Sequence, residues 1–293
     1  SYNSAAFVGD AIASCFSEGV PEGQVIVVDD GSTDDTPSVL AGFADRIRVL
    51  RKENGGASSA RNAGLGLANT RYVIFLDADD RYDGRMIGAL EEAMLKSGAD
   101  IGFGAMQNVR SDGSYGRRQT PPPPEGPGHF LEAWLAGTTV GTNSHRWRAD
   151  VLRRVNGYRE EMKTLEEIEV VVRGILNGAS LVATDTGHSL YFDRGNSDRV
   201  RYGNSIEVIR SAVEGFAAIE RQLTTAGQRR ALGMRYYHLA RSAFRQGYAT
   251  LGRDALSRAR RCGFRGHLGT RGHRILSALI GLELKELWAG QRA

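Results

Sequence analysis

Cysteine is scarce in this chain of 293 residues. Cys15 and Cys262 are the only two, and neither belongs to a CxxC pair. A disulfide framework and a zinc site are therefore not expected. Such a composition fits a reducing compartment, so we expect a cytoplasmic protein.

Long apolar runs are missing too. A membrane-spanning helix needs about 20 mostly apolar residues, and no stretch of the sequence approaches that length. No signal peptide is visible. With 41% apolar and 25% charged residues, the composition is ordinary for a globular protein. The length suits one large domain, or a domain with an appendage.

A strong net charge is also absent, since the chain carries only +4. The positive charge is uneven, because residues 201–274 are rich in arginine. These arginines form either a solvated helical face or a surface that meets anionic lipid or an anionic acceptor. Nucleic acid is not an expected partner, because no recognised nucleic-acid motif accompanies the arginines.

Two apolar runs end in clustered carboxylates. Residues 25–28 and 72–76 are typical of strands buried on both faces, as in parallel sheets. Open α/β sheets bind ligands at the carboxyl ends of their strands. Two acidic strand ends therefore indicate a site for a polyanion and a divalent cation. The acids are Asp29, Asp30, Asp77, Asp79 and Asp80.

Strands alternate with helices in the first two thirds of the chain, which predicts an α/β fold with a parallel sheet flanked by helices. Only helical patterns follow. We therefore expect a domain over residues 1–203 and an all-α C-terminal appendage over residues 204–293. The predicted strands are 25–28, 48–51, 72–76, 100–109 and 144–147. The predicted helices are 4–18, 34–44, 57–69, 84–97, 129–136, 149–155, 204–224, 227–246, 249–262 and 271–289.

Three motifs follow one another in the first domain. They are Val28-Asp29-Asp30-Gly31-Ser32-Thr33-Asp34, Asn54-Gly55-Gly56-Ala57-Ser58-Ser59-Ala60-Arg61-Asn62-Ala63-Gly64 and Phe75-Leu76-Asp77-Ala78-Asp79-Asp80. In this order and spacing they resemble the family 2 glycosyltransferases, and the resemblance covers roughly residues 1–200. It implies a GT-A fold, Rossmann-like with a mostly parallel sheet, and transfer of a sugar with inversion of configuration.

The resemblance also bears on the beginning of the chain. In the family, a Ser-Tyr-Asn or Thr-Tyr-Asn follows the first strand directly, whereas here nothing precedes Ser1-Tyr2-Asn3. A parallel sheet without its first strand would expose apolar faces and unpaired backbone groups. We therefore expect that the natural protein has a further N-terminal segment.

The resemblance implies a nucleotide-sugar donor, here a UDP-sugar, whose diphosphate gains charge as the glycosidic bond breaks. Mn²⁺ or Mg²⁺ held by carboxylates neutralises such charge. The resemblance implies Asp79 as the first metal ligand, Asp77 as a ribose or metal contact, and Asp80 as a reserve ligand. In an extended segment Asp77 and Asp79 would point the same way. The alternative is a charged turn that caps the helix after residue 84.

Four further residues are implied as donor contacts. Asp30 accepts a hydrogen bond from the base, and Tyr2 stacks on it. Arg61 meets base or phosphate, or else forms a structural ion pair with Asp29 or Asp77. Arg194 stands near the point where many family members have a histidine, and it could meet the diphosphate as a cation.

An inverting transfer needs one general base to take the proton of the acceptor hydroxyl. The family usually has the Asp of a Glu-Asp pair at a helix start, and here Glu166 and Glu167 occupy that place. The resemblance implies Glu167 as the base, although its side chain is one methylene longer than aspartate. A misplacement near 1 Å costs about 10²-fold in rate. The alternative is that these acids only complement the helix dipole.

The resulting hypothesis is an inverting glycosyltransferase that acts on a hydroxyl of a glycan or lipid-linked glycan of the cell envelope. The alternative is a non-catalytic nucleotide-sugar-binding module with a helical interaction tail. In that tail, an apolar stripe on the last helix packs on other helices or on a second copy, or else lies on an anionic membrane. The stripe consists of Leu276, Leu279, Ile280, Leu284 and Leu287. The membrane alternative implies a peripheral contact at the inner face of the plasma membrane.

Overall fold

The computed structural model describes residues 1–123, 125–193, 205–266 and 281–290, with 268, 270, 272, 274, 275 and 277 between the last two ranges. The chain divides into two compact units. The first unit comprises Ser1–Pro127, Thr138–Glu160 and Arg173–Asn196, and the second comprises Gly128–Gly137, Glu161–Val172 and Ser197–Ala293. The predicted division at residue 203 falls within a range outside this description and stays a prediction.

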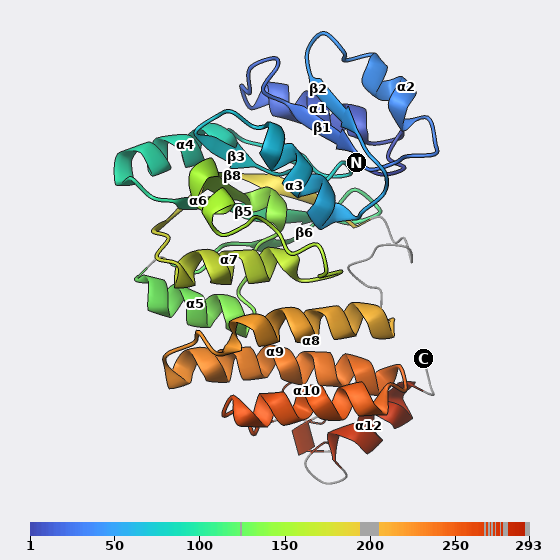
Figure 1. The fold of residues 1–293 in the computed structure, drawn as a ribbon, viewed down its shortest axis with the longest axis vertical. Coiled ribbons are helices and arrows are strands. Elements are labelled where there is room, and N and C mark those ends of the chain that lie inside the picture. The colour runs from blue at the N-terminus through green and yellow to red at the C-terminus, as the bar shows by residue number, and fades with distance from the viewer. Residues whose placement is uncertain are drawn as a thin grey trace. The chain divides into compact units, whose positions relative to one another are not determined.

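The first unit contains two sheets among its described residues (Figure 1). A two-stranded sheet pairs β1 (Ile26–Asp29) with β2 (Arg48–Arg51). A six-stranded sheet has the order β3-β7-β5-β8-β4, and β6 pairs with β5. Its strands are β3 (Tyr72–Ile74), β4 (Arg81–Asp83), β5 (Ile101–Val109), β6 (Tyr115–Gln119), β7 (His145–Arg148) and β8 (Leu181–Phe192).

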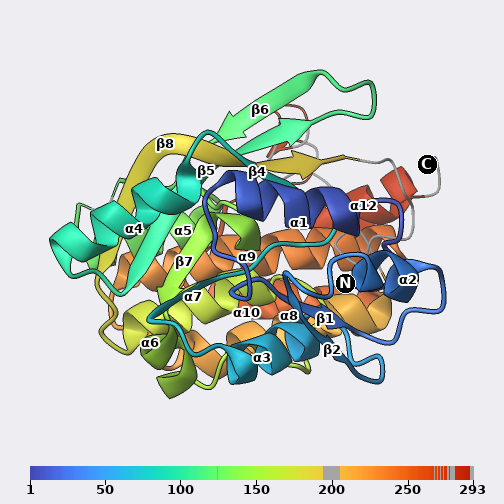
Figure 2. The same ribbon diagram turned by 90° about the horizontal axis from the view of Figure 1, so that it is seen from above.

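The six-stranded sheet is mixed, which differs from the mostly parallel sheet that we expected. Within it only β5 and β8 pair in parallel, whereas β3–β7, β4–β8, β5–β6 and β5–β7 are antiparallel. A hairpin joins β5 to β6, which lie beside each other in Figure 2. Strands joined by a short loop pair antiparallel, whereas β3–β7 and β4–β8 pair strands that are distant in the sequence. The short strand β4 carries no periodic pattern and was not predicted.

Helices cover the sheets of the first unit. Gly102 and Gly104 of β5 allow α4 to pack closely, since a Cβ atom at either position would lie under 3 Å from the Met94 or Met86 sulfur. Val8 and Ile12 of α1 pack with Val27 of β1 in a buried cluster. The helices are α1 (Val8–Ser17), α2 (Thr36–Ala41), α3 (Ala57–Leu67), α4 (Met86–Ser97) and α6 (Ala149–Arg154), with a 3-10 turn at Thr142–Ser144. Each predicted helix of this part is confirmed to within a few residues.

The described part of the second unit is helical, as predicted. Thr225 and Gln228 form a capping box at the start of α9, and left-handed Gly247 and Gly263 follow α9 and α10. In Figure 1, α8, α9 and α10 lie side by side. The helices are α5 (Pro127–Ala136), α7 (Glu166–Leu176, which continues into the first unit), α8 (Ile206–Glu220), α9 (Ala226–Arg245), α10 (Ala249–Arg261) and α12 (Leu282–Gly290).

The last helix is held to α9 by a buried carboxylate. Glu286 of α12 accepts hydrogen bonds from Arg241 Nε at 2.8 Å and Arg245 Nε at 2.7 Å. Burial raises the pKa of Glu286, but the hydrogen bonds from Arg241, Arg245 and Lys285 outweigh it and hold the pKa below its usual value. Of the predicted apolar stripe, Leu276, Leu279 and Ile280 lie outside the described residues, Leu287 is half-buried and Leu284 is 63% exposed. No helix in the described part of the chain is both long and apolar enough to cross a membrane.

Candidate functional site

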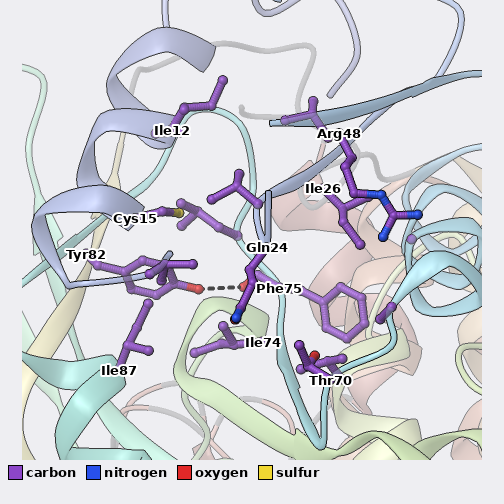
Figure 3. A pocket seen from close by; sticks show the side chains of 18 of the residues that line it. Ile12, Cys15, Gln24, Ile26, Arg48, Thr70, Ile74, Phe75, Tyr82 and Ile87 are labelled. Atoms are coloured by element: carbon purple, nitrogen blue, oxygen red, sulfur yellow. Dashed lines mark hydrogen bonds between the residues drawn. The ribbon is translucent and has the colours of Figure 1, made fainter. Parts of the chain in front are cut away.

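An apolar cavity of about 410 Å³ lies in the first unit between β1 and the segment that contains β3. Figure 3 shows Ile12 and Cys15 of α1, Ile26 of β1 and Ile74 of β3 around it. Burial raises the pKa of the Cys15 thiol to about 12, so this thiol is neutral at physiological pH. Most of the side chains that line this cavity are apolar, and the charged ones among them include Arg61 and Asp77.

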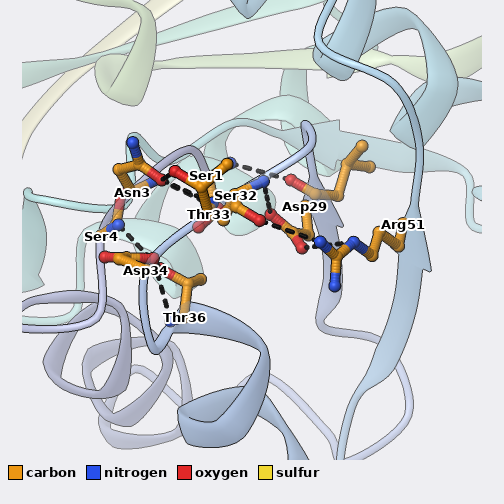
Figure 4. A network of polar contacts seen from close by, with 10 residues as sticks. Ser1, Asn3, Ser4, Asp29, Ser32, Thr33, Asp34, Thr36 and Arg51 are labelled. Carbon is orange, nitrogen blue, oxygen red and sulfur yellow. Dashed lines mark hydrogen bonds and ion pairs between the residues drawn. The ribbon is translucent and has the colours of Figure 1, made fainter.

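Asp29 organises the turn that follows β1. Its Oδ1 accepts the N–H of Ser32 at 3.0 Å, and its Oδ2 lies 3.5 Å from Arg51 Nε. Ser32 Oγ in turn accepts the N–H of Asn3 at 2.9 Å (Figure 4). Asp29 is only 1% exposed. It therefore connects β1, β2 and the first residues of the chain from the interior.

Asp30 is a buried anion held by three donors. Its carboxylate accepts Lys52 Nζ at 2.7 Å, the N–H of Gly55 at 3.1 Å and the N–H of Gly56 at 2.7 Å. Burial raises the pKa of Asp30, but the hydrogen bonds from Lys52, Gly55 and Gly56 outweigh it and lower the pKa below its usual range. Gly31 has a φ of +80°, and a Cβ atom there would lie 2.9 Å from the backbone nitrogen of Asn54. The two loops approach this closely only because residue 31 is glycine.

Residues from both acidic strand ends lie close to Ser1. The nitrogen of Ser1 donates to the carbonyl of Val28 at 2.8 Å, and the N–H of Asp30 donates to the carbonyl of Ser1 at 2.8 Å. Ser1, Arg61 and Asp77 line the same cavity. The segments that follow residues 28 and 76 therefore meet beside Ser1.

Asp77 pairs with Arg61, one of the two alternatives that the sequence left open for this arginine. Arg61 Nη2 donates to Asp77 Oδ1 at 2.8 Å, and the guanidinium lies 5.3 Å from the centre of the Tyr158 ring. The ion pair does not test the other alternative, in which Arg61 contacts the base or a phosphate of the donor. It also brings a cation to the carboxylate expected to bind ribose or metal.

The acidic segment after β3 is a turn, so our expectation of an extended segment was wrong. The N–H of Asp80 donates to the carbonyl of Asp77 at 3.0 Å, which closes a four-residue turn. β3 accordingly ends at Ile74 rather than at residue 76. The relative directions of Asp77 and Asp79 are therefore set by this turn and not by the alternation of a strand.

Asp80 faces the protein interior. Asn143 Nδ2 donates to its Oδ2 at 3.0 Å, and the N–H of Phe192 donates to its Oδ1 at 3.1 Å. Both carboxylate oxygens thus join the turn to the 3-10 segment and to the end of β8. These contacts are typical of a structural residue. The role of Asp80 as a reserve metal ligand stays a prediction.

Of the other implied contacts with the sugar donor, the structure describes Tyr2 but not Arg194. Tyr2 is 49% exposed, which suits a ring that stacks on a base. Arg194 lies outside the described residues. His188 is on β8, and its Nδ1 lies 3.2 Å from Arg118 Nη1. This position and contact suit a structural role for the histidine.

The donor set fits a hard divalent cation that arrives with a phosphate ligand. Within the described residues, no group of three or more His, Cys, Asp or Glu is placed to hold a metal ion. Asp77 and Asp79 nevertheless supply two carboxylates in one turn. Mg²⁺ is usually bound through one or two carboxylates together with substrate phosphates, so these residues would hold it once a diphosphate is present.

Glu166 and Glu167, the two candidates for the general base, begin α7 in the second unit. They follow Leu165, whose φ of +61° is rare for a bulky residue and costs of order 1–2 kcal/mol. Glu166 and Glu167 are half-buried, whereas Glu169 is fully buried. Such strain often marks a functional position, and here it immediately precedes the two acids.

Glu167 interacts with a half-buried arginine from α9. Arg235 donates through Nε to the carbonyl of Leu135 at 2.7 Å and through Nη2 to that of Trp134 at 2.9 Å. Burial lowers the pKa of Arg235 to about 10, and the negative charge of Glu167 opposes that shift. The C-terminal helices thus supply a cation to the start of α7.

Three of these residues were missed by the sequence reasoning. Lys52 directly follows a predicted strand, so its place beside Asp30 could have been inferred from parallel pairing of residues 25–28 with 48–51. Asn143 and Arg235 carry no comparable signal, because they reach Asp80 and Glu167 from distant parts of the sequence.

The chain matches the family described as Glycosyl transferase family 2 over residues 1–153. It is similar to Glycosyltransferase GlyG of Streptococcus pneumoniae, with 32% identity over 39% of this chain and 40% of GlyG. It is also similar to Succinoglycan biosynthesis protein ExoO of Rhizobium meliloti, with 36% identity over 38% of this chain and 33% of ExoO. The matched segments span less than half the length of these relatives.

Two solved structures resemble the whole chain. One is S. aureus TarS 1–349 in complex with UDP-GlcNAc, with a TM-score of 0.71, 17% identity and coverage of 100% of this chain and 88% of that one. The other is the mannosyltransferase PcManGT from Pyrobaculum calidifontis in complex with GDP-Man and Mn²⁺, with a TM-score of 0.57, 16% identity and coverage of 99% and 85%. This likeness shows a shared fold, and it confirms the predicted GT-A class with C-terminal helices.

The hydrogen bonds of Asp30 predict a pH-dependent contribution to stability. The pKa of Asp30 is lower in the folded than in the unfolded chain, where it is about 3.9. Its contribution is therefore present above pH 4 and is lost as the pH falls through the folded pKa. We expect Asp30→Asn to lower the free energy of unfolding at pH 7 by about 1–3 kcal/mol, and by less at pH 3. Urea denaturation at both pH values measures this.

The exposed Asp45 provides the control, since Asp45→Asn removes the same charge and should change stability by less than about 0.5 kcal/mol. Equal losses for the two variants, or a loss for Asp30→Asn that does not shrink at pH 3, would contradict the prediction.

Proposed function

This chain belongs to glycosyl transferase family 2, and from that membership we propose that it transfers a sugar from a UDP-sugar to a hydroxyl of a glycan or lipid-linked glycan, with inversion of configuration. The observation that carries the proposal is the position of Asp30, which contacts Ser1, beside the ion-paired Asp77 and Arg61, which line one cavity together with Ser1. A nucleoside diphosphate requires such a mixture of acceptors, cations and metal-binding carboxylates.

The donor residues take the following roles. Asp30 accepts a hydrogen bond from the base, and the exposed ring of Tyr2 stacks on it. Asp79, with Asp77, would hold Mn²⁺ or Mg²⁺, which when bound neutralises the charge developing on the departing diphosphate. Arg61 orients Asp77 through their ion pair. Arg194 contributes a further cation toward the diphosphate.

Glu167 takes the acceptor proton in this proposal, with Glu166 beside it. The acceptor oxygen attacks the anomeric carbon on the face opposite the diphosphate, and the bond to the diphosphate breaks. Support for Glu167 comes from the strained Leu165 that precedes it and from the Arg235 cation near it. Arg235 favours the ionised carboxylate, which is the form that accepts a proton.

The acceptor is proposed from the chemistry of the relatives, of which ExoO is named for the biosynthesis of a polysaccharide, succinoglycan. Because the chain spans only part of these relatives, the acceptor class and the cytoplasmic location both belong to the proposal. We further propose that residues 204–293 form a distinct helical region that touches the inner face of the plasma membrane. Leu284, exposed on α12 while Leu282 beside it is buried, supports such a contact.

The membrane contact is tested by flotation with anionic liposomes. We expect the full chain to float at low salt and to be released at high salt, because arginines and an exposed leucine supply the attraction. Leu284→Asp should weaken binding without disturbing Glu286, which anchors α12. Absence of binding at low salt, or equal flotation of the Leu284→Asp variant, would contradict the contact.

Binding of UDP should depend on a divalent cation. Calorimetry with and without Mn²⁺ measures the effect, and Asp79→Ala should remove most of the Mn²⁺-dependent part of the affinity because it deletes a metal-binding carboxylate. Asp83→Ala, which removes an exposed acid on β4, is the matched control. Identical UDP affinity under all these conditions would remove the metal from the proposal.

Replacement of Glu167 by Gln should abolish transfer while UDP binding stays nearly unchanged. The substitution keeps the shape of the side chain and removes its basicity, so we expect a loss of at least about 10² in turnover. Glu166→Gln is the comparison and should retain more activity. Full activity of Glu167→Gln together with loss in Glu166→Gln would move the base by one position. Binding of UDP-sugar without any transfer by the unmodified chain would favour the non-catalytic alternative.

A further inference from the structure

Lys52 occupies a position beside Asp30 that the proposed mechanism does not use. It follows β2 directly, and its N–H donates to the carbonyl of Asp29 at 3.0 Å, which continues the pairing of β2 with β1. Its side chain then returns to Asp30, with Nζ 2.7 Å from Oδ1. The parallel register therefore places the Asp30 carboxylate, which only accepts hydrogen bonds, beside the Lys52 ammonium, which only donates them.

Both groups retain hydrogen-bonding capacity. The ammonium of Lys52 has three N–H groups, and its described contacts use two of them, to Asp30 Oδ1 and to the carbonyl of Glu53 at 2.6 Å. The Lys52 side chain is 25% exposed, so a ligand can reach it. A carboxylate offers about four acceptor positions, and three donors occupy Asp30. One further donor from a ligand would complete Asp30, and one acceptor from a ligand would complete Lys52.

Gly55 leaves room for the lysine in this place, because a Cβ atom at residue 55 would lie 2.9 Å from Lys52 Nζ and 2.8 Å from Ser59 Oγ. The same residue donates its N–H to Asp30, and the carbonyl of the nearby Glu53 accepts from Lys52 Nζ at 2.6 Å. The loop of residues 53–55 thus contacts both members of the pair.

We propose that Asp30 and Lys52 together select the base of the donor nucleotide, with Asp30 accepting a ring N–H and Lys52 donating to the carbonyl oxygen next to it. The proposal rests on the proposed function, because it places the base of the nucleotide at Asp30. It adds Lys52 as a specificity-determining residue that reads a neighbouring atom of the same ring edge.

The pair distinguishes bases by their ring nitrogens. Uracil and guanine each present a ring N–H beside a carbonyl, which matches an acceptor next to a donor. Cytosine and adenine present an unprotonated ring nitrogen instead, so its lone pair would face the Asp30 carboxylate. A site with buried polar groups strongly rejects a ligand that leaves those groups unpaired.

Calorimetry with UDP, GDP, CDP and ADP tests the selection. We expect the unmodified chain to bind UDP or GDP at least about 10-fold more tightly than CDP and ADP, from the size of one charge-assisted hydrogen bond. Lys52→Met should weaken the preferred nucleotide by about 10-fold or more and CDP by much less. Lys52→Arg, which keeps a donor, should preserve most of the preference. A diphosphate of 3-methyluridine lacks the ring N–H, and it should bind as weakly as CDP.

Arg48→Met is the matched control, because it removes one positive charge from β2, and the Arg48 side chain donates to the carbonyl of Leu67 rather than to Asp30. It should leave the ratio of UDP to CDP affinity unchanged. Thermal unfolding of each variant identifies any loss of folded protein. If Lys52→Met unfolds, the ratio of UDP to CDP affinity of Lys52→Arg tests the role of Lys52 instead. Equal weakening of UDP and CDP in the Lys52 variants, or no weakening at all, overturns the role of Lys52 and leaves the proposed function standing. Failure of the unmodified chain to bind any nucleoside diphosphate overturns the proposed function itself.

Discussion

The fold of the first unit depends on the neutralisation of buried carboxylates at the ends of two strands. A carboxylate removed from water is costly unless charged or hydrogen-bonding partners replace the solvent. Asp29, Asp30 and Asp80 are each buried and each bonded to a different neighbour: the turn after β1, the loop of Gly55 and Gly56, and the end of β8. These contacts draw distant loops to one edge, and that edge is where the proposed donor site lies.

The second unit shows the same requirement at another place. Glu286 is buried against Arg241 and Arg245, and the half-buried Glu167 interacts with Arg235. In both cases α9 supplies the cation. The C-terminal helices are therefore more than a spacer, because one of their arginines contributes to the electrostatic environment of the residue that we propose as the general base.

Much of the architecture could be predicted from local patterns. Helices α4, α9 and α10 follow apolar periodicity and are followed closely by left-handed glycines, so their predicted bounds were close to those observed. The acidic motifs also indicated which strands lead to the acidic loops, although β3 ends two residues earlier than predicted. The turn at Asp77–Asp80 and strand β4 could not be predicted in this way, because a four-residue turn and a three-residue strand lack a measurable period. The antiparallel entry of β7 between β3 and β5 likewise depends on long-range pairing.

The sequence by itself determined the α/β class, the helical C-terminal region and the residue types available for chemistry, because periodicity and turn residues act over a few positions. Tertiary structure decided how those residues are partnered. In the folded chain Asp80 is paired with Asn143, Asp77 with Arg61 and Asp30 with Lys52. These partners are 63, 16 and 22 residues apart in the sequence, and strand register and the close approach of loops bring them together. The charge and accessibility of a carboxylate depend on such partners, which no local pattern specifies.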